Sequence, residues 1–180
     1  FGFGRIGRLA ARELIKQAGK GQQLRLRAIV LRSIDDVTLK KRAALLENDS
    51  VHGRFPGTIE IDYENKHLII NGQRIQIIAS SDPSVIDYAA RGINDALLID
   101  NTGGIETKGA QLAPSINWNQ QGLTYRAGKG IPNIVYGINH SNVDINKDHI
   151  FSAASCTTNA ISPILRVIED NFGIVREHIE

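Results

Sequence analysis

The sequence predicts an α/β fold built on a doubly wound, mostly parallel sheet, and three observations carry that prediction. The chain opens with a glycine-rich turn, Gly2-Phe3-Gly4-Arg5-Ile6-Gly7, that leads into residues with helical periodicity. A segment at 24–31 becomes continuously apolar, as a strand buried in a parallel sheet does. Another segment, 96–99, is fully apolar and ends in polar residues, and this end is where open α/β sheets bind ligands.

Composition indicates a soluble globular protein with one good core. Of 180 residues, 42% are hydrophobic and 22% charged, and 21 basic residues stand against 19 acidic ones, so nucleic acid is not an expected partner. No apolar run approaches the ~18 residues of a membrane span, and a single cysteine excludes an internal disulfide. We therefore expect a reducing, cytoplasmic location. The chain begins at Phe1 and has no methionine, which indicates a piece of a longer protein.

The glycine-rich turn has the G-x-G-x-x-G spacing of Rossmann-like dinucleotide-binding units. Its three glycines allow a tight turn, close approach of the backbone to a pyrophosphate, and close packing of helix on strand. The strand that should precede the turn lies before Phe1, and an ordinary glycine-rich turn is the alternative. The helix that follows is predicted to end at Gly19 and to bury one face, made of Ile6, Ala10, Leu14 and Ala18.

The end of the 24–31 strand bears on the choice of cofactor. An acidic residue about 20 residues after the glycine turn usually binds the adenosine ribose of NAD, whereas an arginine suits the 2′-phosphate of NADP. Arg32 and Ser33 occupy this place, and Asp35 comes slightly later. The pattern favours tolerance of NADP. The alternatives are that Arg32 is a solvated surface charge, or that Asp35 takes the acidic position.

The middle of the chain predicts a helix, a polar loop and an antiparallel meander. The helix covers 35–46, and the loop is Asp49-Ser50-Val51-His52-Gly53, where His52 is either an acid–base group or a hydrogen-bonded loop anchor. Short strands follow at 58–62, 66–70 and 73–78, the last two joined by the strong hairpin turn Asn-Gly. The meander is inserted into the parallel fold and carries no visible chemistry.

Beyond the meander, the 96–99 strand runs into Asp100-Asn101-Thr102-Gly103. Thr102 and Gly103 are candidates to face the cofactor, although Asn-Thr-Gly is also an ordinary turn. From 111 to 130 the apolar pattern loosens, which predicts a surface excursion. Residues 133–140 predict a strand and a turn, with His140 structural. No metal-ligand spacing is present, so no metal site is predicted.

The only cysteine, Cys156, lies in Ser155-Cys156-Thr157-Thr158-Asn159, between a buried strand at 150–154 and a helix that reaches Gly173. The unpaired N–H groups and the dipole at a helix start favour an anion, either a thiolate or phosphate oxygens. This placement predicts a nucleophile beside an anion site, and a small buried hydrophobe is the alternative. Pro163 removes a hydrogen bond inside the helix and predicts a kink.

Read together, these motifs and two more resemble the glyceraldehyde-3-phosphate dehydrogenase family in order and spacing, over nearly all of the chain. The cysteine motif is highly specific for that family. The motifs are Gly2-Phe3-Gly4-Arg5-Ile6-Gly7-Arg8, Asp49-Ser50-Val51-His52-Gly53, Asn101-Thr102-Gly103, Gly137-Ile138-Asn139-His140, Ser155-Cys156-Thr157-Thr158-Asn159 and Asn171-Phe172-Gly173-Ile174-Val175.

The resemblance implies a phosphorylating, NAD(P)-dependent aldehyde dehydrogenase of glycolysis and gluconeogenesis, active as a homotetramer. It implies that glyceraldehyde 3-phosphate, a phosphorylated aldose, is oxidised to 1,3-bisphosphoglycerate. Cys156 attacks the aldehyde, and inorganic phosphate releases the resulting thioester. Ser155 and Thr157 match positions that contact the substrate phosphate and the thioester, and Asn159 is expected to support the turn.

The same resemblance completes the expected cofactor site, because the backbone of Arg5 and Ile6 matches positions that meet the pyrophosphate. The residues expected to bind NAD or NADP are Gly2, Gly4, Arg5, Ile6, Gly7, Arg32, Ser33, Thr102 and Gly103. Residues 1–154 are expected to form the NAD(P)-binding domain without its first strand, and 155–180 the start of a truncated catalytic domain.

Departures from the family pattern limit these expectations. Arg32-Ser33 replaces the family's aspartate, which puts strict NAD preference in doubt, and residues 127–130 replace a serine-rich loop that supplies a cofactor contact. The family's general-base histidine would lie just past Glu180, and His178 comes too early for that role. The 180-residue chain alone is therefore expected to be inactive.

Two other functions stay open. One is a non-catalytic module that binds a dinucleotide and uses Cys156 as an oxidant-sensitive thiol. The other is an erythrose-4-phosphate dehydrogenase, because the residues that distinguish the two sugars lie outside this sequence.

Overall fold

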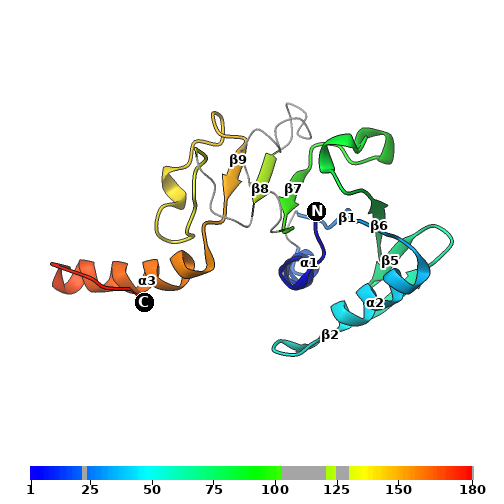
Figure 1. Ribbon diagram of the computed structural model, residues 1–180, viewed down its shortest axis with the longest axis horizontal. Helices are drawn as coiled ribbons and strands as arrows, with labels where there is room; N and C mark the ends of the chain where they lie inside the picture. Colours follow the sequence, from blue (N-terminus) through cyan, green and yellow to red (C-terminus); the bar gives the residue numbers. More distant parts are fainter. Residues whose placement is uncertain (22–23, 103–120, 125–129, 180) are drawn as a thin grey trace. The chain divides into compact units, whose positions relative to one another are not determined.

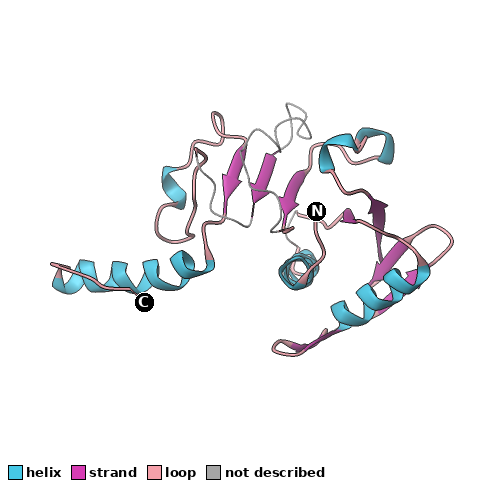
Figure 2. Cartoon of the chain, viewed as in Figure 1, coloured by secondary structure: helices cyan, strands magenta, loops and turns pink. Residues whose placement is uncertain are grey.

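The computed structural model describes residues 1–21, 24–102, 121–124 and 130–179. The chain forms two compact units, Phe1–Asn94 and Asp95–Glu180, which are described one at a time. Figure 1 labels the helices and most of the strands along the chain, and Figure 2 distinguishes helix, strand and loop. No described helix combines the length and the apolar character needed to span a membrane.

The first unit combines two helices with a mixed sheet of strand order β1-β6-β5-β4 and a separate small hairpin, β2–β3 (Figure 1). Its elements are α1 (Arg5–Gly19), β1 (Ala28–Leu31), α2 (Asp36–Glu47), β2 (Asn48–Asp49), β3 (Gly53–Arg54), β4 (Ile59–Asp62), β5 (His67–Ile70) and β6 (Gln73–Ala79), followed by the short 3₁₀ turns η1 (Pro83–Val85) and η2 (Ala89–Arg91).

The predicted mixture of parallel and antiparallel pairing is confirmed in this sheet. Strand β1 pairs in parallel with β6, with Val30 opposite Ile78, while β6, β5 and β4 form the antiparallel meander. Asn71 and Gly72 have φ values of 48° and 76°, and two positive values are what a two-residue type I′ hairpin requires. The N–H of Gly2 donates to the carbonyl of Val30 at 3.3 Å, so the segment before α1 lies beside β1.

Both helices of the first unit contribute to one core. Apolar side chains from α1, α2 and the sheet form a single buried cluster, of which Leu39, Leu46, Leu68, Ile70 and Ile75 are at most 1% exposed. The buried positions of α1 are Gly7, Ala11, Ile15 and Ala18. The predicted face was therefore displaced by about one residue: Ile6 is exposed, because it belongs to the open first turn of the helix.

The second unit contains a parallel sheet of strand order β7-β8-β9 that leads into a helix. Its elements are β7 (Leu97–Asp100), β8 (Gln121–Thr124), the 3₁₀ turn η5 (His140–Asn142), β9 (Ile150–Ser152) and α3 (Cys156–Phe172). The predicted strand before Cys156 and the helix after it are confirmed. Parallel strands with helices in both units agree with the predicted α/β class.

Two predictions for this unit were wrong. The expected surface excursion at 111–130 contains β8, which pairs on both sides, with Leu97 opposite Gln121 and Gly122 opposite Ile150. Pairing on both sides, rather than an apolar run, holds this short strand in the sheet. The strand expected at 133–140 is reduced to one bridge between Asn133 and Ser152, followed by turns. Residues 103–120 and 125–129, with the replaced serine-rich loop at 127–129, lie outside the described residues.

Helix α3 has no buried residue, although its apolar side chains recur at helical spacing. Ile164, Val167 and Phe172 are 60%, 62% and 86% exposed. Pro163 lies inside the helix, and Gly173 ends it with a φ of 73°. The periodicity predicted the helix correctly, but it did not show whether other residues pack against the apolar face of α3.

Candidate functional site

The amino end of α1 is open to a ligand. Gly4 stands at the N-cap position and supplies no side-chain cap, and a Cβ added to Gly4 would meet no described residue within 4 Å. The first hydrogen bond of the helix runs from the N–H of Arg8 to the carbonyl of Gly4, at 3.0 Å. The N–H groups of Arg5, Ile6 and Gly7 therefore have no partner within the helix, and such groups bind phosphate oxygens.

The other two glycines of the motif have the roles that the spacing predicted. Gly2 has a φ of 82°, a left-handed conformation that glycine adopts without strain. Gly7 is buried on the inner face of α1. This turn thus brings together Gly2, Gly4, Arg5, Ile6 and Gly7, the five candidates of the first motif, at one helix end.

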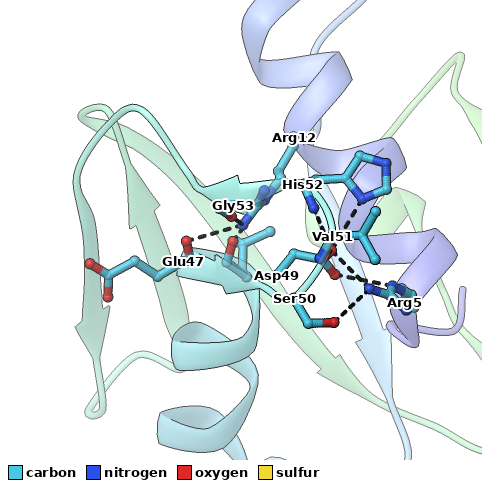
Figure 3. A network of polar contacts seen from close by, with 9 residues as sticks. Arg5, Arg12, Glu47, Asp49, Ser50, Val51, His52 and Gly53 are labelled. Carbon is cyan, nitrogen blue, oxygen red and sulfur yellow. Dashed lines mark hydrogen bonds and ion pairs between the residues drawn. The ribbon is translucent and has the colours of Figure 1, made fainter.

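The side chain of Arg5 points away from the helix end and into the β2–β3 hairpin (Figure 3). Its Nε and Nη2 atoms donate to the two carboxylate oxygens of Asp49, at 3.2 and 3.0 Å, and Nη2 also donates to Ser50 Oγ at 2.9 Å. Sequence reasoning identified this loop as polar but missed the role of Asp49. The signal was the Asp-Ser-x-His-Gly pattern, since aspartate often accepts bonds from the backbone two and three residues on.

The carboxyl end of β1 is occupied by Arg32 and Ser33. Arg32 is exposed, and the Ser33 hydroxyl donates to the carboxylate of Asp35. Asp35 is the N-cap of α2 and accepts from the N–H of Thr38 at 2.8 Å and from its hydroxyl at 2.6 Å. These bonds, that from Ser33 first, hold the pKa of Asp35 well below its usual range. Asp35 is thus committed to the helix cap, which disfavours it as the ribose-binding acid.

In the second unit, Thr102 follows β7 at its carboxyl end, as predicted. Its N–H donates to the buried carboxylate of Asp100 at 2.9 Å, which fixes the turn after the strand. The Thr102 hydroxyl is buried and makes no hydrogen bond among the described residues. A buried hydroxyl of this kind is suited to a ligand, because an unmade hydrogen bond is costly there. Gly103 lies outside the described residues.

Cys156 is the first residue of α3, and its side chain is exposed. The preceding Ser155 caps the helix, since its Oγ accepts from the N–H of Thr158 at 3.0 Å. The N–H groups of Cys156 and Thr157 stand in the first turn, where helix geometry provides no partner. An accessible thiol is thus placed beside two backbone donors.

The turn before the thiol has an unusual backbone. Ala154 is buried and has a φ of 56°, in the left-handed region that a residue with a Cβ rarely adopts. Its N–H donates to the hydroxyl of Ser152 at 3.0 Å. The amide of Asn159 donates to the carbonyls of Ala153 and Ser155 at 2.7 and 2.9 Å, so the prediction that Asn159 supports the turn is confirmed.

His52 and His140 make local hydrogen bonds. His52 Nδ1 lies 3.1 Å from Asp49 Oδ1, and His140 Nδ1 accepts from the N–H of Gly137 at 3.0 Å. These contacts fit a loop anchor and a structural turn. Within the described part of the chain, no group of three or more His, Cys, Asp or Glu side chains could hold a metal ion.

An open glycine turn that leads into a helix, beside a strand paired in parallel, is the arrangement of a dinucleotide-binding α/β domain. Comparison with known families agrees: residues 1–108 match the family model described as glyceraldehyde 3-phosphate dehydrogenase, NAD binding domain. The chain belongs to the glyceraldehyde-3-phosphate dehydrogenase family, and its cofactor domain is of the NAD-binding kind.

Curated relatives align over almost the whole chain. A glyceraldehyde-3-phosphate dehydrogenase-like protein of Pseudomonas aeruginosa is 52% identical over 100% of the chain, which covers 39% of that protein. Glyceraldehyde-3-phosphate dehydrogenases of Chlamydia pneumoniae and Zymomonas mobilis are 35% and 32% identical over 96% and 97% of the chain, which covers 49% of each. The chain thus spans half or less of the length of these relatives.

Proposed function

We propose that the whole protein is a phosphorylating aldehyde dehydrogenase that converts glyceraldehyde 3-phosphate to 1,3-bisphosphoglycerate. The observation that carries this proposal is the exposed thiol of Cys156, at the first residue of α3 and within Ser-Cys-Thr-Thr-Asn, in a chain of this family. The 52% identical relative is named only as dehydrogenase-like, so the activity has to be measured directly.

In this mechanism the Cys156 sulfur, as thiolate, adds to the aldehyde carbon and forms a thiohemiacetal. The N–H groups of Cys156 and Thr157, which helix geometry leaves without a partner, would stabilise the oxygen of that adduct, where negative charge develops. Loss of hydride from the carbon, with loss of the hydroxyl proton to a base, leaves a thioester. Inorganic phosphate then attacks the thioester, which releases the acyl phosphate and regenerates the thiolate. Ser155 and Thr157 are proposed to bind the reacting phosphate and the thioester.

The residues present fit a dinucleotide. The open turn of α1 suits the pyrophosphate, because no described residue lies within 4 Å of a Cβ added to Gly4. By family likeness, Thr102 and Gly103 of the second unit are proposed as further cofactor contacts. When bound, NAD or NADP accepts the hydride. We further propose that Arg32 and Ser33 admit the 2′-phosphate of NADP, because Arg32 is exposed and Asp35 is committed to capping α2.

We also propose a domain division of this chain and the activity expected of these 180 residues alone. Residues 1–154 form the proposed cofactor domain and 155–180 the start of the catalytic domain. None of the described histidines is assigned as the base, so the 180-residue chain alone is proposed to be inactive. By family likeness the whole protein is proposed to be a cytoplasmic homotetramer.

Two alternatives remain beside this proposal. Erythrose 4-phosphate is a rival substrate of the same chemistry. An exposed thiol also favours a non-catalytic dinucleotide-binding module with a redox-sensitive cysteine, since accessible thiolates are the ones that oxidants reach.

The test uses the whole protein and its Cys156→Ser variant. We expect the wild type to reduce NAD or NADP with glyceraldehyde 3-phosphate and phosphate, and to form an acylated Cys156 detectable by mass spectrometry. The variant should lose the acylated species and keep its NAD affinity in calorimetry. Turnover with erythrose 4-phosphate alone would favour the rival substrate, and NAD binding without turnover on either sugar would favour the module. Survival of acylation in the variant would remove Cys156 from the mechanism.

A further inference from the structure

The three arginines of α1 connect this helix to the rest of the first unit. Arg5, Arg8 and Arg12 are spaced three and four residues apart, so they lie on one side of the helix. Arg12 donates to the carbonyls of Leu46 and Glu47, at 2.8 and 3.0 Å, and to that of Gly53 at 3.1 Å, and so holds the end of α2 and the β2–β3 hairpin (Figure 3).

Arg5 and Arg8, together with Arg42 of α2, make contacts at and around the glycine turn. Arg8 and Arg42 both donate to the carbonyl of Phe3, inside the glycine turn, at 3.3 and 3.2 Å. Arg5, in the first turn itself, forms a two-point ion pair with Asp49. Two-point pairs of this kind fix orientation as well as position.

Asp49 is the residue on which these contacts converge. Its Oδ1 accepts from the N–H groups of Val51 and His52, each at 3.0 Å, lies 3.1 Å from His52 Nδ1, and is shared with Arg5 Nη2. The side chain of Asp49 is only 7% exposed, whereas that of Arg5 is 45% exposed. The donors, with Arg5 first, hold the pKa of Asp49 well below its usual range, so the carboxylate stays charged.

The other two helices fix their first turns differently. Asp35 caps α2 and Ser155 caps α3 through their own side chains, but Gly4 offers α1 no such bond. A capping side chain would occupy N–H groups that a phosphate needs. In α1 the ion pair between Arg5 and Asp49 holds the first turn instead. This leaves the first-turn N–H groups open to a phosphate and still limits their motion.

We propose that Asp49 is a positioning residue for the pyrophosphate of the bound dinucleotide: by anchoring the Arg5 side chain to the β2–β3 hairpin, it orients the first-turn N–H groups of α1. Asp49 itself does not touch the cofactor in this proposal. The inference depends on the NAD-binding domain and not on the proposed aldehyde chemistry.

The test measures binding in the whole protein. Asp49→Asn preserves the shape of the side chain but removes the charge that holds Arg5, and it should raise the Kd for NAD about tenfold, the scale of one charge-assisted hydrogen bond. Ser50→Ala removes a single bond to Arg5 and should raise the Kd by about two- to threefold. Glu13→Gln is the matched control, because it removes a carboxylate from α1 that pairs only with Lys16 and Gln17 of the same helix among the described residues.

Competition with fragments of the cofactor separates positioning from general loss of structure. ADP, which carries the diphosphate, should compete about tenfold more weakly against labelled NAD in Asp49→Asn, whereas adenosine should compete as in the wild type. Wild-type affinity for NAD and ADP in a folded Asp49→Asn variant would overturn the proposal, and so would equal losses for ADP and adenosine. If Asp49→Asn does not fold, an unchanged Kd in Ser50→Ala overturns it.

Discussion

The turn before Cys156 gives a prediction whose size follows from the structure. Ser152 is fully buried, and its hydroxyl accepts from the N–H of Ala154, which is 4% exposed. Ser152→Ala leaves this N–H buried without a partner, at a cost of about 1–3 kcal/mol. Ala154 itself, with a φ of 56°, carries about 1–2 kcal/mol of strain that a glycine would not. Ser152→Ala should therefore destabilise the protein, and adding Ala154→Gly should restore about 1 kcal/mol of that loss.

The assay is urea unfolding of the wild type, of Ser152→Ala, of Ala154→Gly and of the double variant. Alkylation of Cys156 by iodoacetamide is the second measurement. In Ser152→Ala the alkylation of Cys156 should also become slower or depart from a single exponential, because the turn no longer holds the thiol in one position. Ser141→Ala, at an exposed serine in η5, is the matched control and should change neither measurement. Wild-type stability in Ser152→Ala, or a double variant no more stable than Ser152→Ala, would refute the role given to this hydrogen bond.

Three further predictions follow. Arg32→Asp should lower the NADP/NAD ratio of kcat/KM, and Arg27→Asp, exposed just before β1, should not; an unchanged ratio counts against the 2′-phosphate assignment. Because the pKa of Asp49 is lowered on folding, its contribution to stability is complete above the ordinary aspartate value of ~3.9 and is lost as pH falls through the native value. The difference in Tm between wild type and Asp49→Asn should thus be constant above about pH 5 and become smaller below about pH 4. A difference that grew below about pH 4 would contradict the lowered pKa of Asp49. Leu46→Ala, at 0% exposure, should cost about 2–5 kcal/mol in urea unfolding, whereas Val37→Ala, 78% exposed on the same helix, should cost less than about 0.5 kcal/mol.

Local patterns predicted the elements whose causes are themselves local. Asn71-Gly72 specified its hairpin, because few other dipeptides accept two positive φ values, and the spacing of glycines predicted the open turn of α1. Gln121–Thr124 could not be found this way, since its strand exists through pairing with β7 and β9, which are distant in sequence. The buried face of α1 was displaced for a similar reason: which residues are covered depends on what packs against the helix.

For the candidate site, too, local features were predictable from the sequence and long-range contacts were not. The residue types at both helix starts were visible in the sequence, but the contacts that hold them were not. Asp49 is more than forty residues from Arg5 along the chain, and only the folded hairpin brings their side chains to 3.0 Å. Contacts between residues so far apart leave no periodic signal in the sequence. The sequence therefore indicated which residues form the site, but not which contacts position them.

Ala154 shows why local propensity fails where the thiol is placed. Propensity predicts glycine at a left-handed position, and a glycine there would relieve the strain but allow the backbone more conformations. Alanine is tolerated because Ser152 holds its N–H and Asn159 holds the carbonyls on both sides of it. Strained residues persist only where their surroundings determine the conformation. The strain at Ala154 and its supports therefore act together, and they restrict the direction in which α3 and the Cys156 sulfur leave β9.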